Sequence, residues 1–279
     1  LFPLLQHVLQ PVILSDDDHA TFAHREPTAA VEFEVIANLD AGRNLHSLVD
    51  DAALDPRMPT DVDTFEAFVA DKDKAKRTKM IDKLLDDPGY VRSLTTHWAN
   101  LLIGRGTPRN INRGALQKFL RESFGKNRAW NQIVSDLVAA EGNSEENGAT
   151  NYLLSHLNEG AVPATAITAK LFLGMQVQCT QCHNHPFNDW KQGAFWEFNS
   201  FFKQTGRRDH QKYNPQTGRN EFDYAELTRP NFEGPVYFER RNGLMEVAFP
   251  KYNGVLVSPE SDVNRRQELA KIITAGEKT

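Results

Sequence analysis

Cysteine is the scarcest informative residue in this 279-residue sequence: there are only two, too few for the disulfide framework of a small secreted domain. Long apolar runs are also missing. None approaches the roughly 18 residues that span a bilayer, so we expect no transmembrane segment. Lysines and arginines are scattered and the formal net charge is −5, which argues against a nucleic-acid partner or a basic membrane anchor. The apolar start Leu1–Leu5 is too short for a signal peptide, so we identify none in this chain.

Both cysteines lie in one short motif, Cys179-Thr180-Gln181-Cys182-His183. This C-x-x-C-H spacing is the attachment sequence of c-type haem, in which each thiol bonds one vinyl group and the histidine is the proximal iron ligand. With this composition, two randomly placed cysteines would give this spacing followed by histidine only about 1 time in 4,000, so chance is a poor explanation of the motif. The sequence therefore predicts one covalently bound haem c, held by Cys179 and Cys182, with His183 on the iron.

Three other interpretations of the motif stay open: a C-x-x-C disulfide, a different metal, and coincidence. A redox C-x-x-C pair normally begins a helix after a strand, whereas this pair follows a helical run at 170–178. Zinc needs four ligands, which Cys179, Cys182, His183 and His185 would supply. Because two of these four are adjacent in sequence, a single tetrahedron would be strained. Haem is the leading interpretation.

His185 is assigned to the haem environment but not to the iron. It lies two residues from His183, whereas the two axial ligands of a haem stand on opposite faces. We expect it to donate a hydrogen bond to a propionate or a bound water. The alternative is a turn histidine before Pro186.

For the second axial position, His97 is the leading candidate. It lies in a helical stripe with Tyr90, Leu94 and Leu101, which directs it toward an apolar face. A lone histidine in such a stripe is more often a core residue that is hydrogen-bonded to a neighbouring helix than a ligand. The remaining alternatives are an open, five-coordinate iron and three further histidines, His24, His156 and His210.

Hydrophobic periodicity predicts a mainly α protein, a helical domain with a small β-containing C-terminal extension. We expect helices at about 60–70, 74–85, 90–103, 116–120, 130–138, 163–178 and 190–203. A hairpin is expected where 236–238 and 244–249 flank Arg240–Gly243, because Asn-Gly favours a tight turn.

These signals divide the chain into three parts. Residues 1–58 form a poorly defined N-terminal segment, with one strand-like alternation at 31–39. Residues 59–205 form the helical domain that carries the motif, and residues 206–279 form the strand-bearing extension.

The segment 173–187, followed by Trp190, Gln192 and Phe201-Phe202, resembles the planctomycete-specific cytochrome-like domain family. Its members are large secreted proteins of largely unknown function. Further agreement lies at Arg77, Ile81-Asp82, Leu84-Leu85, Pro88, Tyr90, His97-Trp98, Trp130, Gly142, Asn147-Gly148 and Asn151. The resemblance covers about residues 60–205. It implies a cytochrome-like domain with haem on the C-x-x-C-H motif, and a second conserved domain whose connection begins at 265–273.

Covalent haem attachment generally occurs outside the cytoplasmic membrane, so we expect an extracytoplasmic protein, periplasmic or secreted. The favoured function is an electron-transfer or redox module that works with a redox partner protein or in a larger assembly. The first alternative is a haem enzyme with an open distal site, peroxidase- or oxidase-like. The second is a non-haem structural or assembly protein whose C-x-x-C is a clasp. Whether the protein is an enzyme is open at this point.

Overall fold

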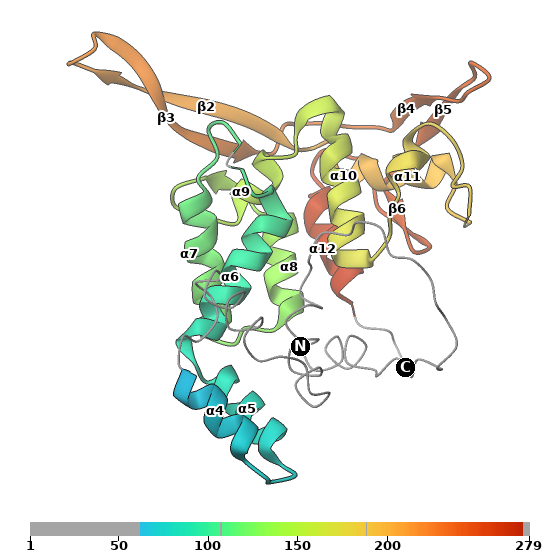
Figure 1. Ribbon diagram of the computed structural model, residues 1–279. Helices are drawn as coiled ribbons and strands as arrows, with labels where there is room; N and C mark the ends of the chain where they lie inside the picture. Colours follow the sequence, from blue (N-terminus) through green and yellow to red (C-terminus); the bar gives the residue numbers. More distant parts are fainter. Residues whose placement is uncertain (1–61, 107, 188, 276–279) are drawn as a thin grey trace. The chain divides into compact units, whose positions relative to one another are not determined.

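The computed structural model describes residues 62–106, 108–187 and 189–275. The chain divides after Ser93 into two compact units, which are considered separately (Figure 1). The expected N-terminal segment 1–58, with its strand at 31–39 and His24, lies outside the described residues. Within the described part, no helix is long and apolar enough to cross a membrane.

The first unit contains two complete helices, α4 (Val62–Ala70) and α5 (Lys76–Leu85), as the sequence predicts. The next helix, α6, spans Pro88–Ile103 and continues into the second unit. Pro88 occupies its first position, where a missing N–H costs nothing. The Asp87 side chain accepts a hydrogen bond from the Gly89 N–H at 2.5 Å, which caps the new helix.

The second unit is built on helices whose inward faces repeat every three or four residues. Leu116 and Leu120 are fully buried on α7, and Ile133 and Leu137 on α8. The helices after α6 are α7 (Arg113–Gly125), α8 (Trp130–Ala139), α9 (Thr150–Leu154), α10 (Asn158–Leu173), α11 (Gln192–Asn199) and α12 (Arg265–Thr274). Two 3₁₀ turns, η2 (Gln178–Gln181) and η3 (Ser200–Phe202), complete the helical part.

Helix α10 begins with a left-handed turn. Glu159, Gly160 and Ala161 all have positive φ, so the regular helix starts only near Pro163, as the sequence predicts. Its end at Gly174, with φ 68°, is a left-handed glycine cap that turns the chain toward the motif.

The second half of the chain forms three small antiparallel sheets. The first has the order β1-β3-β2, with β1 at Gly142–Asn143, β2 at Gly206–Asn214 and β3 at Arg219–Thr228. The others are the pairs β4 (Val236–Glu239) with β5 (Met245–Ala248) and β6 (Lys251–Tyr252) with β7 (Val255–Leu256). The hairpin predicted through Arg240–Gly243 is confirmed, and Gly243 has the φ of 81° that the turn requires.

The prediction of a mainly α protein with a small β extension is wrong. The fold is mixed α/β, 48% helical and 16% strand. The long β2–β3 ribbon, which extends away from the helices of its unit in Figure 1, escaped prediction because its strands are mostly exposed and polar. Without apolar alternation there is no strand signal to read. Nor is this sheet a simple appendage, because Gly142 and Asn143 pair with Leu227 and Glu226.

Candidate functional site

The C-x-x-C-H residues lie on an exposed turn between α10 and α11. Cys179 is within η2 and Cys182 directly follows it, and both thiols are free and exposed. Thr180 between them is fully buried, and its N–H and hydroxyl both donate to the Val177 carbonyl, at 2.9 and 2.5 Å. The turn thus points its threonine inward and leaves both sulfur atoms accessible.

His183 is half-buried, and its Nδ1 donates to the Asn184 carbonyl at 2.6 Å. This hydrogen bond places the ring proton on Nδ1 and leaves the lone pair on Nε2. Histidines that bind metals usually donate their other ring N–H to a carbonyl or carboxylate in this way. The imidazole therefore has the tautomer that a proximal iron ligand needs.

His185 has the opposite tautomer. Its Nδ1 accepts a hydrogen bond from the Phe187 N–H at 3.1 Å, so the neutral ring carries its proton on Nε2. Its backbone N–H donates to the Trp190 carbonyl at 2.9 Å, which closes the loop after the motif. With Nδ1 occupied, His185 is a hydrogen-bond donor through Nε2.

Two side chains of α11 hold the motif turn in place. Gln192 Nε2 and Trp196 Nε1 both donate to the Gln181 carbonyl, at 3.2 and 3.1 Å. Gln192 Nε2 also donates to the Glu239 carbonyl at the end of β4, at 3.0 Å. The sequence predicts no anchoring role for either residue. The available signal was Gln192 itself, one of the positions at which the chain resembles the family.

The aromatic residues near the motif divide into two groups. Phe195, Phe198, Phe201 and Phe202 are fully buried and form part of the core. Trp190 and Trp196 are half-buried beside the motif; Trp196 stacks on Phe238 of β4, with centroids 5.8 Å apart. Trp190 lies 6.4 Å from Tyr252, centroid to centroid.

The structure brings Cys179, Cys182, His183 and His185 onto one turn, whereas His97 lies half-buried on α6. The buried face of α6 carries Thr95, Ala99 and Leu102, and Leu101 of the expected stripe is 51% exposed. The inward face differs from the prediction because Trp98 packs on Trp130 of α8, with ring centroids 4.1 Å apart. Two apolar stripes overlap on this helix, and periodicity alone does not choose between them.

Two of the alternative histidines have other partners. His156 Nε2 lies 2.7 Å from the Leu102 carbonyl, and burial lowers its pKa against the opposing effect of that hydrogen bond. His210 Nε2 lies 2.8 Å from the Glu226 carboxylate on the β2–β3 ribbon. Among the described residues, no group of three or more His, Cys, Asp or Glu side chains is arranged to hold a metal ion. The tetrahedron that the zinc alternative needs is therefore not formed.

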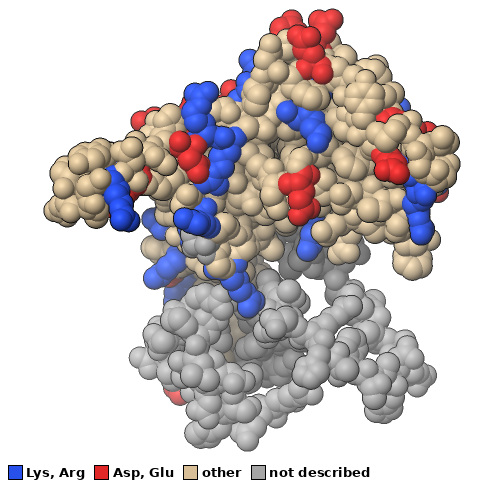
Figure 2. Space-filling view, turned by 90° about the horizontal axis from the view of Figure 1, so that it is seen from above, with Lys and Arg blue, Asp and Glu red and all other residues tan. Residues whose placement is uncertain are grey.

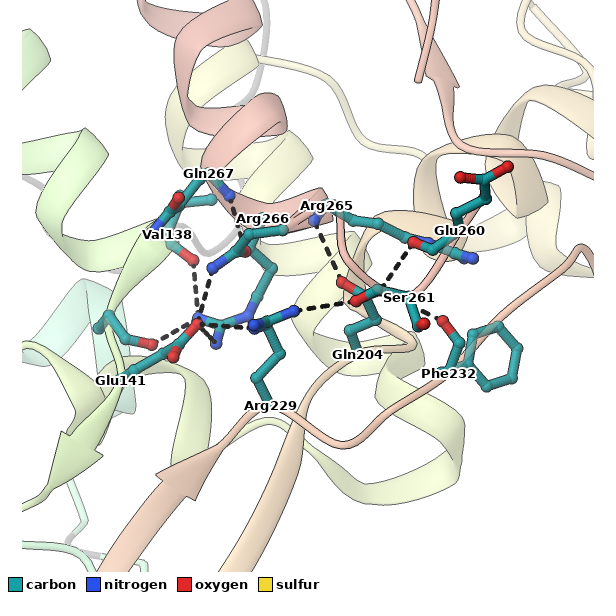
Figure 3. A network of polar contacts seen from close by, with 12 residues as sticks. Val138, Glu141, Gln204, Arg229, Phe232, Glu260, Ser261, Arg265, Arg266 and Gln267 are labelled. Carbon is teal, nitrogen blue, oxygen red and sulfur yellow. Dashed lines mark hydrogen bonds and ion pairs between the residues drawn. The ribbon is translucent and has the colours of Figure 1, made fainter. Parts of the chain in front are cut away.

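A second polar centre, absent from the sequence predictions, lies where α12 begins (Figure 3). Arg266 is fully buried; its Nη1 donates to the carbonyls of Val138 and Ala140, at 3.1 and 2.5 Å. Its Nη2 is 3.4 Å from the Glu141 carboxylate. Burial lowers the pKa of Arg266 to about 10, partly opposed by Glu141, so the side chain is still charged at neutral pH.

Arg265 is also fully buried, and its acceptors are the Ser200 hydroxyl, at 3.2 Å, and three carbonyls. It donates to those of Ser200, Gly234 and Pro259, at 3.2, 2.9 and 2.6 Å. Its guanidinium also lies 5.1 Å from the centre of the Phe232 ring. The Nη donors of both arginines bond groups of the fold itself. This centre therefore connects α12 with the end of α8 and with the loops at Gly234 and Pro259, and it is not a ligand site.

Surface charge adds no further site on the face shown in Figure 2. Lysines and arginines are interspersed there with aspartates and glutamates, in keeping with the scattered charges of the sequence. Among the described residues, the motif turn is therefore the place where side chains able to bind a cofactor lie close together. Two accessible thiols and an imidazole with a free lone pair on Nε2 fit a covalently attached haem.

Comparison with known protein families matches residues 55–207, more than half of the chain, to a family described as PSCyt2, protein of unknown function (DUF1549). The matched range includes the whole motif turn and its α11 anchors. No curated protein and no solved structure matches the chain.

Proposed function

The chain belongs to the PSCyt2 family of proteins of unknown function, and we propose that it is a c-type haem protein that serves as an electron-transfer or redox module. The observation that carries this proposal is the donor set of the motif turn. Cys179 and Cys182 are free and exposed, and His183 has its Nδ1 bound to a carbonyl. These are the groups that covalent attachment and iron ligation require.

Each residue of the turn has a definite role in this proposal. Cys179 and Cys182 hold the haem through two thioether bonds, and His183 ligates the iron through Nε2. His185, with its Nδ1 occupied by Phe187, donates from Nε2 to a haem propionate or a bound water. The haem, when bound, supplies a one-electron carrier whose potential the surrounding hydrogen bonds adjust.

Location and partner follow from the same chemistry. Because covalent haem attachment generally takes place outside the cytoplasmic membrane, we place the working protein there, periplasmic or secreted. A one-electron carrier needs a donor and an acceptor, so we propose a redox partner protein; the two cysteines that would hold the haem are exposed, where such a partner could approach.

The cofactor is tested by producing the full chain in a periplasm that contains a haem-attachment system. The expected product has the polypeptide mass plus one haem and a pyridine haemochrome spectrum of a haem with two thioether bonds. Cys179→Ala and Cys182→Ala each remove one thioether bond, and the double variant carries no covalent haem. Folded wild-type protein at full yield with the bare polypeptide mass would refute the proposal and favour a structural clasp.

The ferric spectrum of the same preparation separates electron transfer from catalysis. Low-spin, six-coordinate iron supports an electron-transfer module. High-spin iron that binds cyanide or peroxide rapidly would instead favour the alternative function, a haem enzyme with an open distal site.

For the second axial ligand we propose His97, a half-buried imidazole in the same unit as the motif. His97→Ala should convert low-spin to high-spin iron, while the control His210→Ala, on the β2–β3 ribbon, should leave the spectrum unchanged. An unchanged spectrum in a folded His97→Ala protein would leave His97 as a core residue.

A further inference from the structure

Gln192 is 7% exposed at the start of α11, and it joins three separate segments of the chain. One amide N–H bonds the Gln181 carbonyl at 3.2 Å and the other bonds the Glu239 carbonyl at 3.0 Å. Its backbone N–H donates to the Asn184 side chain at 3.0 Å. Both hydrogens of its NH₂ group are used, so the glutamine has one well-defined position.

These contacts bracket the proximal histidine. Gln181 lies two residues before His183, and its carbonyl is held by Gln192 and, one helical turn further along α11, by Trp196. Asn184 lies one residue after His183; its carbonyl accepts from His183 Nδ1 and its side chain accepts from Gln192 N. The Gln181–Cys182 peptide before His183 and the Asn184 side chain after it are therefore both tied to one residue of α11.

Gln181 is the residue before the second cysteine of the motif. Its side chain is a variable position in C-x-x-C-H, but its backbone carbonyl is the group that α11 bonds here. Fixing the Gln181 carbonyl fixes the peptide plane that leads into Cys182. The spacing of the thiols and the direction of His183 then depend on a hydrogen bond made from outside the motif.

We propose that Gln192 is a positioning residue for haem attachment: its amide holds the C-x-x-C-H backbone in the conformation that presents both thiols and His183 to one haem. This inference rests on the proposed function. Its bond to Glu239 makes that conformation depend on the β4–β5 ribbon, whose inner residue Phe238 also stacks on Trp196. Hydrogen bonds that hold a metal ligand in its orientation typically change metal affinity by about 10- to 100-fold when they are removed.

The test compares Gln192→Leu with Gln204→Leu in the full chain. Gln204 is a matched control because it is 1% exposed and its amide also donates to two carbonyls, those of Phe232 and Glu260, away from the motif turn. Under limiting haem supply, Gln192→Leu should lower the fraction of chains with covalent haem about 10-fold and shift the midpoint potential of the loaded fraction. Gln204→Leu should reduce stability but leave both readouts as in wild type.

A haem-free measurement separates this inference from the proposed function. In protein produced without haem attachment, Gln192→Leu should speed amide hydrogen exchange at Cys182 and His185, whose N–H groups bond the carbonyls of Cys179 and Trp190. Gln204→Leu should not. Trp196→Phe, which removes the indole donor to Gln181 and keeps an aromatic ring beside Phe238, should give a smaller change in the same direction, and it decides the matter if Gln192→Leu does not fold.

Wild-type protein that loads haem while Gln192→Leu matches Gln204→Leu in loading, potential and exchange would overturn the positioning role. Wild-type protein that loads no haem would instead overturn the proposed function, and the positioning role with it. Faster exchange in Gln192→Leu would then show only that the turn is held by α11.

Discussion

Replacing Arg266 by methionine should destabilise the fold more than any ordinary surface substitution. The side chain is fully buried where α12 meets α8, and it donates to the carbonyl of Val138 in the last turn of α8 and to that of Ala140 directly after the helix (Figure 3). Such carbonyls have no partner within their own helix. Methionine fills a similar volume but donates nothing.

The magnitude follows from the two carbonyls. A buried polar group that loses its partner costs about 1–3 kcal/mol, so two of them cost about 2–6 kcal/mol. Part of this is recovered because a buried cation no longer has to be desolvated. Glu141 stays 38% exposed and keeps its bond from Asn264 at 2.8 Å, so little is lost there. We therefore expect the free energy of unfolding to fall by about 2–4 kcal/mol.

The assay is urea unfolding followed by circular dichroism, with amide exchange of α12 as a local measure. Arg266→Lys should lie between wild type and Arg266→Met, because one ammonium group lacks the planar fork that reaches several acceptors together. Arg241→Met, in the exposed turn between β4 and β5, is the control and should change stability by less than about 0.5 kcal/mol. If Arg266→Met is as stable as the control, or more stable, then the guanidinium does not stabilise the fold through its hydrogen bonds to these two carbonyls.

Two further predictions concern buried positions. A Cβ at Gly148 would lie 2.1 Å from the Ala115 carbonyl oxygen, so Gly148→Ala should lower the unfolding free energy by about 2–3 kcal/mol, measured by urea unfolding. Gly193→Ala on α11, where a Cβ meets nothing within 4 Å, should be neutral or stabilising by up to about 1 kcal/mol; equal effects of the two changes would contradict this. His156 has a lowered pKa when folded, so the unfolded chain takes up its proton first, and stability should fall as pH drops through the ordinary value of 6.5 toward the lower folded value. His156→Gln should reduce that decline between about pH 7 and 5, and an unchanged pH profile in a folded variant would rule out the buried imidazole as its source.

Much of the helical part of the fold was readable from the sequence because its signals are local. Leu116 and Leu120, and Ile133 and Leu137, repeat at helical spacing and are buried as that spacing requires. The turn through Arg240–Gly243 was readable because Asn-Gly specifies a tight turn by its own backbone preference. The β2–β3 ribbon was not, because cross-strand pairing rather than an apolar face defines it.

The candidate site divides in the same way. Cys179, Cys182 and His183 are contiguous, so their proximity is a property of the sequence itself and needed no tertiary information. The tautomer of His183 depends on the next residue's carbonyl, and the anchoring by Gln192 depends on a helix that begins ten residues after the second cysteine.

Local sequence therefore suffices for the presence and spacing of the reactive groups and for the helices with regular apolar periods. Which polar groups meet depends on tertiary contacts. Two adjacent arginines at the start of a helix are normally solvated, yet Arg265 and Arg266 are fully buried because the carbonyls of Val138, Ser200 and Gly234 converge on them. A hydrogen-bond acceptor more than a hundred residues away, such as the Val138 carbonyl for Arg266, leaves no trace in local sequence. Such contacts between distant residues bury the charges of Arg265 and Arg266 and hold the motif turn against α11.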